Sequence, residues 1–170
     1  MPSFDGEWRI DAERSKVWDY ETGQYLVDEV GEEIIRIRTD GDIQDYEVLL
    51  GDRPTIRMGY TNRFDDKAWV DYTVREVIGV GEGQEESEIR AFIERTKSHV
   101  KDFSIGASYG LVRSVYVDER THYRLSKSPK DGSAEYIMLR RLDENGEAYT
   151  ATVMRTDGIV SRIRRFIRIK

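Results

Sequence analysis

The sequence contains no cysteine and only two histidines in 170 residues. Without thiols the chain can form no disulfide, no thiolate zinc site and no cysteine nucleophile. His99 and His122 are too few for a multi-histidine metal site. We therefore expect neither a metal site nor thiol chemistry.

Long apolar runs are also absent. No stretch approaches the roughly 18 apolar residues that a membrane-spanning helix needs. The first residues carry four carboxylates and no apolar core segment, which predicts no secretory signal. We expect a cytoplasmic protein with no membrane partner, organised as one domain over residues 1–170, a length that buries roughly 70% of the unfolded surface.

The charges divide unevenly along the chain. Residues 1–85 hold 10 basic and 21 acidic side chains, and residues 86–170 hold 17 and 12, so the halves carry −11 and +5. The overall charge of −6 predicts no general affinity for nucleic acid. Oppositely charged halves most simply pair within the fold as cross-strand neighbours. The alternative is that the oppositely charged halves of two copies pair with each other. The sequence therefore also suggests a homodimer.

The glycine-rich segment Gly79-Val80-Gly81-Glu82-Gly83 superficially resembles a dinucleotide-binding loop. Its third glycine is misplaced, its surroundings are rich in glutamate, and no second parallel strand follows. We therefore expect no cofactor, and interpret the segment as a hinge before a helix.

Most of the chain alternates apolar and polar residues with the period of two that is typical of half-buried strands. About ten such segments are separated by turns with Asp-Gly or Asn-Gly signals, and residues 6–11 and 15–20 are predicted as two separate first pieces. One helix is predicted near residues 86–100, with Ile89, Phe92, Ile93 and Val100 on one face. The predicted fold is mainly β: a single antiparallel up-and-down β-barrel of about 8–10 strands with one mid-chain helix.

The predicted hairpin over residues 109–125 carries the candidate catalytic group. If residues 119–121 form a three-residue loop, Asp118 lies opposite His122, and a carboxylate beside an imidazole suits acid–base chemistry. A two-residue loop would instead place Val117 beside His122. With the first loop, an apolar face of Val115, Val117, Tyr123 and Leu125 opposes a polar face of Tyr116, Asp118, His122 and Arg124. The candidate catalytic residues are His122, Asp118 and Tyr116; a buried structural histidine bonded to an aspartate is the alternative.

Arginines and tyrosines recur within the predicted strands. A pocket for an anionic or phenolic amphiphile needs an arginine for the head group and aromatic walls for the body. Outward arginines paired with neighbouring carboxylates are the alternative explanation. The candidate ligand-binding residues are Arg57, Tyr60, Tyr72, Arg75, Tyr123, Arg124 and Tyr136.

Gly6-Glu7-Trp8 on the first strand, together with arginines such as Arg164 or Arg168 on the last, resembles the lipocalin and fatty-acid-binding (calycin) pattern. In that family the tryptophan packs near an arginine of the last strand at the closed end of a barrel. This chain departs from the pattern, because its predicted helix follows a mid-chain strand and no helical pair follows the first strand. The resemblance implies a barrel that binds a small molecule.

Three functions follow from these features. The first is binding of a small hydrophobic or aromatic ligand with a polar or anionic head inside the barrel. The second is a cofactor-free isomerase, cyclase, lyase or hydratase that uses His122 as acid or base. The third is a packed barrel that forms oligomers. The helix would cover one barrel end, either as a mobile lid or as a fixed plug.

Overall fold

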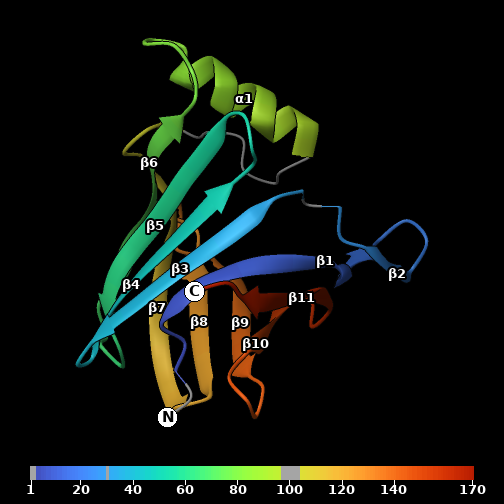
Figure 1. Ribbon diagram of the computed structural model, residues 1–170, viewed down its shortest axis with the longest axis vertical. Helices are drawn as coiled ribbons and strands as arrows, with labels where there is room; N and C mark the ends of the chain where they lie inside the picture. The colour runs from blue at the N-terminus through green and yellow to red at the C-terminus, as the bar shows by residue number, and fades with distance from the viewer. Residues whose placement is uncertain (1–2, 30, 97–103) are drawn as a thin grey trace.

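The computed structural model describes residues 3–29, 31–96 and 104–170. Its strands form one antiparallel sheet in the order β11-β10-β9-β8-β7-β6-β5-β4-β3-β1-β2, and a further pairing of β11 with β1 closes ten of them into a barrel (Figure 1). Neighbours in sequence pair in space from β3 to β11, as in an up-and-down meander. The predicted fold class is confirmed.

The elements follow the turns that the sequence marks. The strands are β1 (Gly6–Asp19), β2 (Gln24–Val27), β3 (Glu33–Asp40), β4 (Ile43–Leu50), β5 (Thr55–Arg63), β6 (Val70–Ile78), β7 (Ser108–Asp118), β8 (Thr121–Lys127), β9 (Ala134–Leu142), β10 (Ala148–Arg155) and β11 (Val160–Arg168), with the helix α1 (Glu85–Thr96) between β6 and β7.

The two predicted first pieces are one long strand. β1 pairs with β11 along its length, but the register shifts between Asp11 and Lys16. Ser15 lies in this irregularity, where its hydroxyl donates to the Asp11 carbonyl at 2.7 Å and accepts the Arg165 amide at 3.0 Å. The prediction of a break was wrong because a buried serine bonds the displaced backbone and lets the strand bend without ending.

The closed end of the barrel holds the tryptophan that suggested the calycin resemblance. Trp8 is fully buried, and the Arg168 guanidinium lies 4.1 Å from its ring centre. The indole donates to the Phe4 carbonyl at 2.8 Å, while Arg168 donates to the carbonyls of Asp5 and Ser3 at 2.5 and 2.6 Å. The N-terminal segment is thereby held across this end, and the predicted packing of Trp8 against an arginine of the last strand is confirmed.

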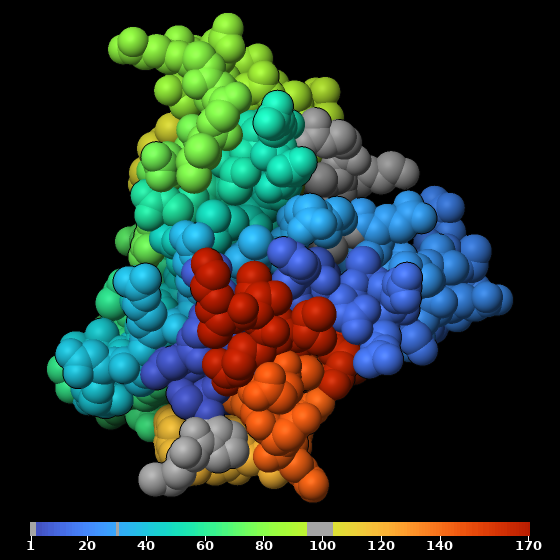
Figure 2. Space-filling model, viewed as in Figure 1, coloured from blue at the N-terminus to red at the C-terminus, as the bar shows by residue number. Residues whose placement is uncertain are grey.

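The helix lies at the opposite end (Figure 1) and stands out from the barrel in the space-filling view (Figure 2). Ile89 and Phe92 belong to the buried core, and Phe92 approaches Gly51 at the turn between β4 and β5. Three glutamates in the first turn suit the positive end of the helix dipole. Val100, predicted on the same face, lies outside the described residues. Within the described residues, no helix is long and apolar enough to span a membrane.

The barrel has two different walls. In the wall β3–β6, apolar and aromatic side chains face inward and, apart from the buried Glu33, charged side chains face outward. In the wall β7–β11 the interior is mixed, because His122, Arg124 and Arg140 are buried beside apolar residues such as Val112 and Leu142, while half-buried apolar residues also face out. The apolar face predicted for the hairpin therefore lies outside the barrel. The hydrogen-bond register aligns one outer row of Val115, Tyr123, Leu139, Thr152 and Ile163, and a second of Arg113, Leu125, Ile137 and Met154.

Candidate ligand site in the barrel interior

An arginine surrounded by tyrosines occupies the barrel interior. Arg124 comes from β8, and its guanidinium carbon lies 5.2, 5.8, 5.4 and 5.5 Å from the ring centres of Tyr46, Tyr60, Tyr72 and Tyr136. It donates one hydrogen bond, from Nη2 to the Tyr136 hydroxyl at 3.0 Å. The electron-rich ring faces stabilise the cation that burial would otherwise destabilise.

A second buried arginine, Arg140, comes from the neighbouring strand β9. Its side chain is fully buried, and its guanidinium carbon lies 5.2 Å from the centre of the Tyr46 ring and 5.7 Å from that of Phe4. Its Nη2 donates to Gln44 Oε1 at 2.8 Å. The Tyr46 ring therefore contacts both interior guanidinium groups.

These two arginines leave several buried donors without a partner. Nε and Nη1 of both Arg124 and Arg140 donate to no partner, and neither does Gln44 Nε2, while the Tyr60 hydroxyl has no hydrogen-bond partner. Among the described residues, no carboxylate forms an ion pair with either guanidinium. A guanidinium stays charged at any physiological pH, and a buried unpaired charge is costly. The interior thus presents two cations and a set of donors suited to an anion.

The contrast with Arg164 shows how this barrel neutralises a buried cation. Arg164 on β11 donates to Asp28 at 2.7 Å and to Glu33 at 2.9 Å, and both carboxylates are buried. Arg162, one inward position away, is also largely desolvated: burial lowers its pKa, and the charge of Arg164 lowers it further. The same two carboxylates oppose this effect, so they balance both arginines of β11. Among the residues that the structure describes, Arg124 and Arg140 have no such counterions.

Half-buried residues line the barrel toward the helix end. Tyr109, Tyr136 and Val153 pack on the core without being fully buried. Burial raises the pKa of Tyr46 and of Tyr109 to about 12, so both hydroxyls remain protonated donors near neutral pH. Toward the helix end, the arginine–tyrosine cluster is therefore followed by side chains that are partly polar and partly apolar.

His122 lies elsewhere, near the closed end. Its ring centre is 4.5 Å from Phe4, 4.7 Å from Phe64 and 5.4 Å from Tyr116. Burial lowers the pKa of His122 to about 3, and the charge of Arg140 contributes to the decrease. The imidazole is therefore neutral at neutral pH, and its buried Nδ1 has no hydrogen-bond partner within the described part of the chain.

The predicted pairing of His122 with Asp118 is wrong. In the hairpin Tyr116 lies opposite His122, and Asp118 lies opposite Thr121 after an irregularity in the register. The Asp118 carboxylate instead accepts the Arg120 amide at 2.8 Å in the turn. The loop is thus two residues long, residues 119–120. Val117 is an extra residue in β7 without a partner in β8, so the alternative pairing of Val117 with His122 does not form either. The acid–base role of His122, Asp118 and Tyr116 stays a prediction that the geometry does not support.

The predicted ligand-binding residues separate into two groups. Tyr60, Tyr72, Arg124 and Tyr136 meet inside the barrel. Tyr123 points outward, because its inward neighbours on β8 are His122 and Arg124.

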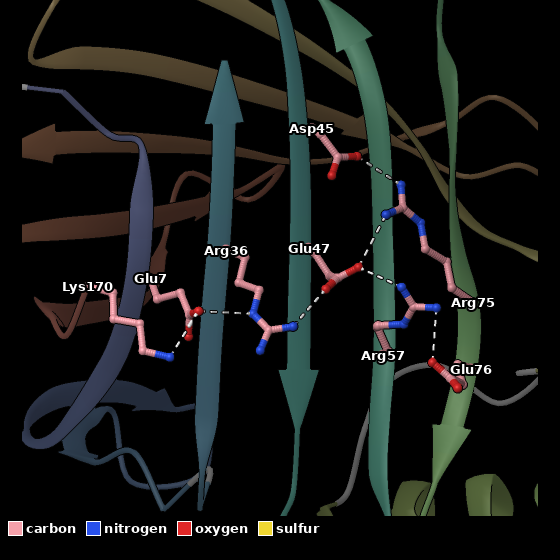
Figure 3. A network of polar contacts seen from close by, with 8 residues as sticks. All are labelled: Glu7, Arg36, Asp45, Glu47, Arg57, Arg75, Glu76 and Lys170. Atoms are coloured by element: carbon pink, nitrogen blue, oxygen red, sulfur yellow. Dashed lines mark hydrogen bonds and ion pairs between the residues drawn. The ribbon is translucent and has the colours of Figure 1, made fainter. Parts of the chain in front are cut away.

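Arg57 and Arg75 lie on the outer surface, in an ion-pair network centred on Glu47 (Figure 3). Glu47 accepts from Arg57 at 3.0 Å and from Arg36 and Arg75 at 3.4 Å each. A Cβ on Gly59 would lie 2.8 Å from the Arg75 guanidinium carbon, so the glycine lets Arg75 cross the strand. The prediction that Arg57, Arg75 and Tyr123 face a pocket was wrong, and the alternative of outward ion pairs holds for both arginines.

The sequence prediction missed Arg140, Gln44 and Tyr46. Tyr46 and Gln44 share the inward face of β4, and Tyr46 lies directly opposite Tyr60. The period-two pattern around Tyr46 could have placed it with Tyr60 once that pairing was assumed. Arg140 stands next to Arg141 in the sequence, and nothing local distinguishes the buried arginine from the exposed one.

A polar depression of about 640 Å³ also exists on the outside of the barrel, at the closed end. Its walls hold guanidinium and carboxylate groups together, and Arg165 donates to Asp143 at 2.5 Å beside it. Charges of both signs compensate one another there, unlike those of Arg124 and Arg140. It is lined by Arg120, Arg141, Leu142, Asp143, Glu144, Asn145 and Thr150.

The closed ten-stranded barrel, with Trp8 beneath an arginine of the last strand, is similar in fold to the calycin-type β-barrels. A solved Schistosoma mansoni fatty acid binding protein in complex with arachidonic acid matches with a TM-score of 0.58 and 15% identity, over 100% of this chain and 98% of that chain. The REP1-NXSQ fatty acid transporter matches with a TM-score of 0.54 and 11% identity, over 98% and 96%. A mutant of the fluorescent protein UnaG matches with a TM-score of 0.57 and 14% identity, over 98% and 96%. No protein-family model matches the sequence, and no curated protein matches it.

Proposed function

We propose that this protein binds a small amphipathic molecule inside the barrel, with the anionic head group of that molecule against Arg124 and Arg140. The observation that carries the proposal is the set of unpartnered donors on these two buried guanidiniums. A carboxylate or similar anion would supply both the missing acceptors and the missing counter-charge. Charge-assisted bonds of this kind are the stronger ones in a low-dielectric interior.

The apolar body of the ligand would lie among tyrosine rings, directed toward the helix end. Tyr72 and Tyr109 contact each other edge to face at 5.2 Å, and Tyr136 lies beside Arg124. Rings that carry hydroxyls can hold an apolar chain and still donate hydrogen bonds. Because the interior side chains are closely spaced, some tyrosines must change rotamer before a ligand can enter. A barrel whose interior is permanently packed would not allow this change.

Two of the structural neighbours bear names that refer to fatty acids, and one was solved with arachidonic acid. This supports a ligand with an acidic head and an apolar chain, although the identity with this chain is at most 15%. A catalytic role for His122 receives no comparable support, since its nearest groups are aromatic rings and it lacks the predicted carboxylate.

The test is calorimetric titration with dodecanoate and with dodecanol, which share an apolar chain but differ in head-group charge. We expect dodecanoate to bind more tightly, by roughly 10- to 100-fold, the worth of a charged hydrogen bond in a buried site. Arg124→Met and Arg140→Met should each remove most of that preference while leaving the binding of dodecanol nearly unchanged.

Arg75→Met is the matched control, because it removes an arginine of similar size from the outer face of the same barrel. It should leave both affinities unchanged. Equal affinity for the two probes, or equal losses in all three variants, would contradict the head-group assignment. Absence of binding by both probes would instead favour a barrel that is simply packed.

A further inference from the structure

The outer face of the wall β7–β11 is apolar at its centre. The outer rows of this wall pair across the strands, so that Leu125 lies opposite Ile137 and Ile137 lies opposite Met154. Ile137 and Met154 are 39% and 41% exposed, which is high for side chains of this size. Thr152 joins Leu139 to Ile163 in the first row, and Arg113 of β7 ends the second row beside Leu125, so the charged side chain lies at the edge of the patch. Apolar side chains thus form a continuous patch over five strands.

The other wall shows that this composition is not a general feature of the barrel surface. Arg36, Glu47, Arg57 and Arg75 occupy the outward positions of β3–β6 and form a chain of ion pairs (Figure 3). Strands of the same barrel therefore expose opposite chemistries. Contiguous exposed apolar patches of several hundred Å² mark interaction surfaces in soluble proteins.

We propose that the outer face of β7–β11 is the interface of a homodimer, in which two copies pack their apolar rows face to face. Five strands about 4.8 Å apart, with about six residues each, span roughly 24 by 20 Å, or about 500 Å² in projection. This projected area, which includes the charged margins of the wall, compares with the roughly 800 Å² of accessible surface per partner in a standard interface. A patch without charge at its centre is complementary to itself, as a two-fold interface requires.

The charges at the two ends of the wall favour one arrangement of the copies. The closed-end turns, residues 118–120 and 143–147, hold five acidic residues and one basic residue, and the neighbouring Arg141 and Arg165 offset part of this charge. The helix-end turns, residues 127–133 and 155–159, hold three basic and two acidic residues. A two-fold axis perpendicular to the strands places the acidic end of each copy over the basic end of the other. The opposite arrangement would bring two acidic ends together, which repel.

The test is sedimentation velocity over a micromolar to millimolar concentration range, with Ile137→Glu as the perturbing variant. A glutamate at the centre of the patch would be buried without a partner in the dimer, so the dissociation constant should rise by at least about 100-fold. Ile43→Glu is the matched control, because Ile43 is 40% exposed at the start of β4 on the other wall. It should dimerise like the wild-type protein.

Met154→Lys provides a second perturbation of the same patch, should Ile137→Glu fail to fold, and it is expected to weaken the dimer similarly. A wild-type protein that remains monomeric throughout the range overturns the proposal. So does a dimer that neither patch variant weakens, or one that Ile43→Glu weakens as much, because its interface would then lie elsewhere. None of these outcomes depends on whether the interior binds a ligand.

Discussion

Acidification should destabilise this protein through His122 in particular. Only 5% of the residue is exposed, and aromatic rings surround the imidazole. In the unfolded chain the imidazole takes up a proton near its ordinary pKa of 6.5, whereas burial keeps the folded pKa at about 3. Between these two values the unfolded state binds more protons, so its free energy falls relative to that of the folded state as the pH decreases.

The expected loss follows from these two pKa values. The stabilisation from a neutral, buried His122 is present above pH 6.5 and decreases as the pH falls toward 3. From pH 7 to pH 5 the free energy of unfolding should decrease by about 2 kcal/mol from this residue alone. Carboxylates titrate mainly below this window and contribute little to the change within it.

The assay is urea denaturation of the wild-type protein and of His122→Phe at both pH values. Phenylalanine keeps an aromatic ring among Phe4 and Phe64 but takes up no proton. The variant should lose about 2 kcal/mol less than the wild type between pH 7 and pH 5. Equal losses in the two proteins would refute the reasoning, and a titration of the His122 ring by NMR with a midpoint near 6.5 would refute its premise.

Four further perturbations test other parts of the structure. Trp8→Ala should reduce the free energy of unfolding by roughly 3–5 kcal/mol in urea denaturation, because the fully buried indole also anchors the N-terminal segment. Gly59→Ala should reduce it by about 1–3 kcal/mol, since the new Cβ would lie 2.6 Å from the Tyr46 carbonyl oxygen. Arg140→Met should raise it by about 1 kcal/mol or more in the same assay without ligand, because an unpaired buried charge disappears. If α1 is a lid, hydrogen exchange of its amides should be faster than that of β9, whereas equal protection would identify a fixed plug.

The barrel itself could be predicted from the sequence because its determinants are local. Alternation with a period of two and Asp-Gly or Asn-Gly turns mark most of the strands, for example at Gly146 and Gly158, which both adopt positive φ. Trp8 and Arg168 could be matched through a family resemblance. The continuity of β1 could not be predicted, since it depends on Ser15 bonding to the backbone of a strand that lies far away in the sequence.

Which face of each strand points into the barrel was harder to predict from the sequence. Alternation shows that the two faces of a strand differ, but it does not show which face points inward. For β8 the rule that apolar residues lie inside predicts Tyr123 and Leu125 in the core, whereas the structure buries His122 and Arg124. The exception depends on tyrosines from three other strands, β4, β5 and β6, that meet Arg124 only after the barrel closes. Such non-local compensation leaves no pattern in the hairpin itself.

The wall β7–β11 connects the two proposals physically. Residues that alternate along a strand must go to opposite sides, so a strand that places Arg140 inside necessarily places Leu139 outside, and β8 does the same with Arg124 and Leu125. A wall that points polar side chains into the interior therefore places apolar side chains on its outer surface. Contact with a partner would shield these side chains from water. A two-residue change of register in β9 would preserve these faces, but a one-residue slip would bury Leu139 and expose Arg140, which removes the interior cation and the outer patch together. If both proposals hold, the dimer covers the apolar surface that a cationic interior creates.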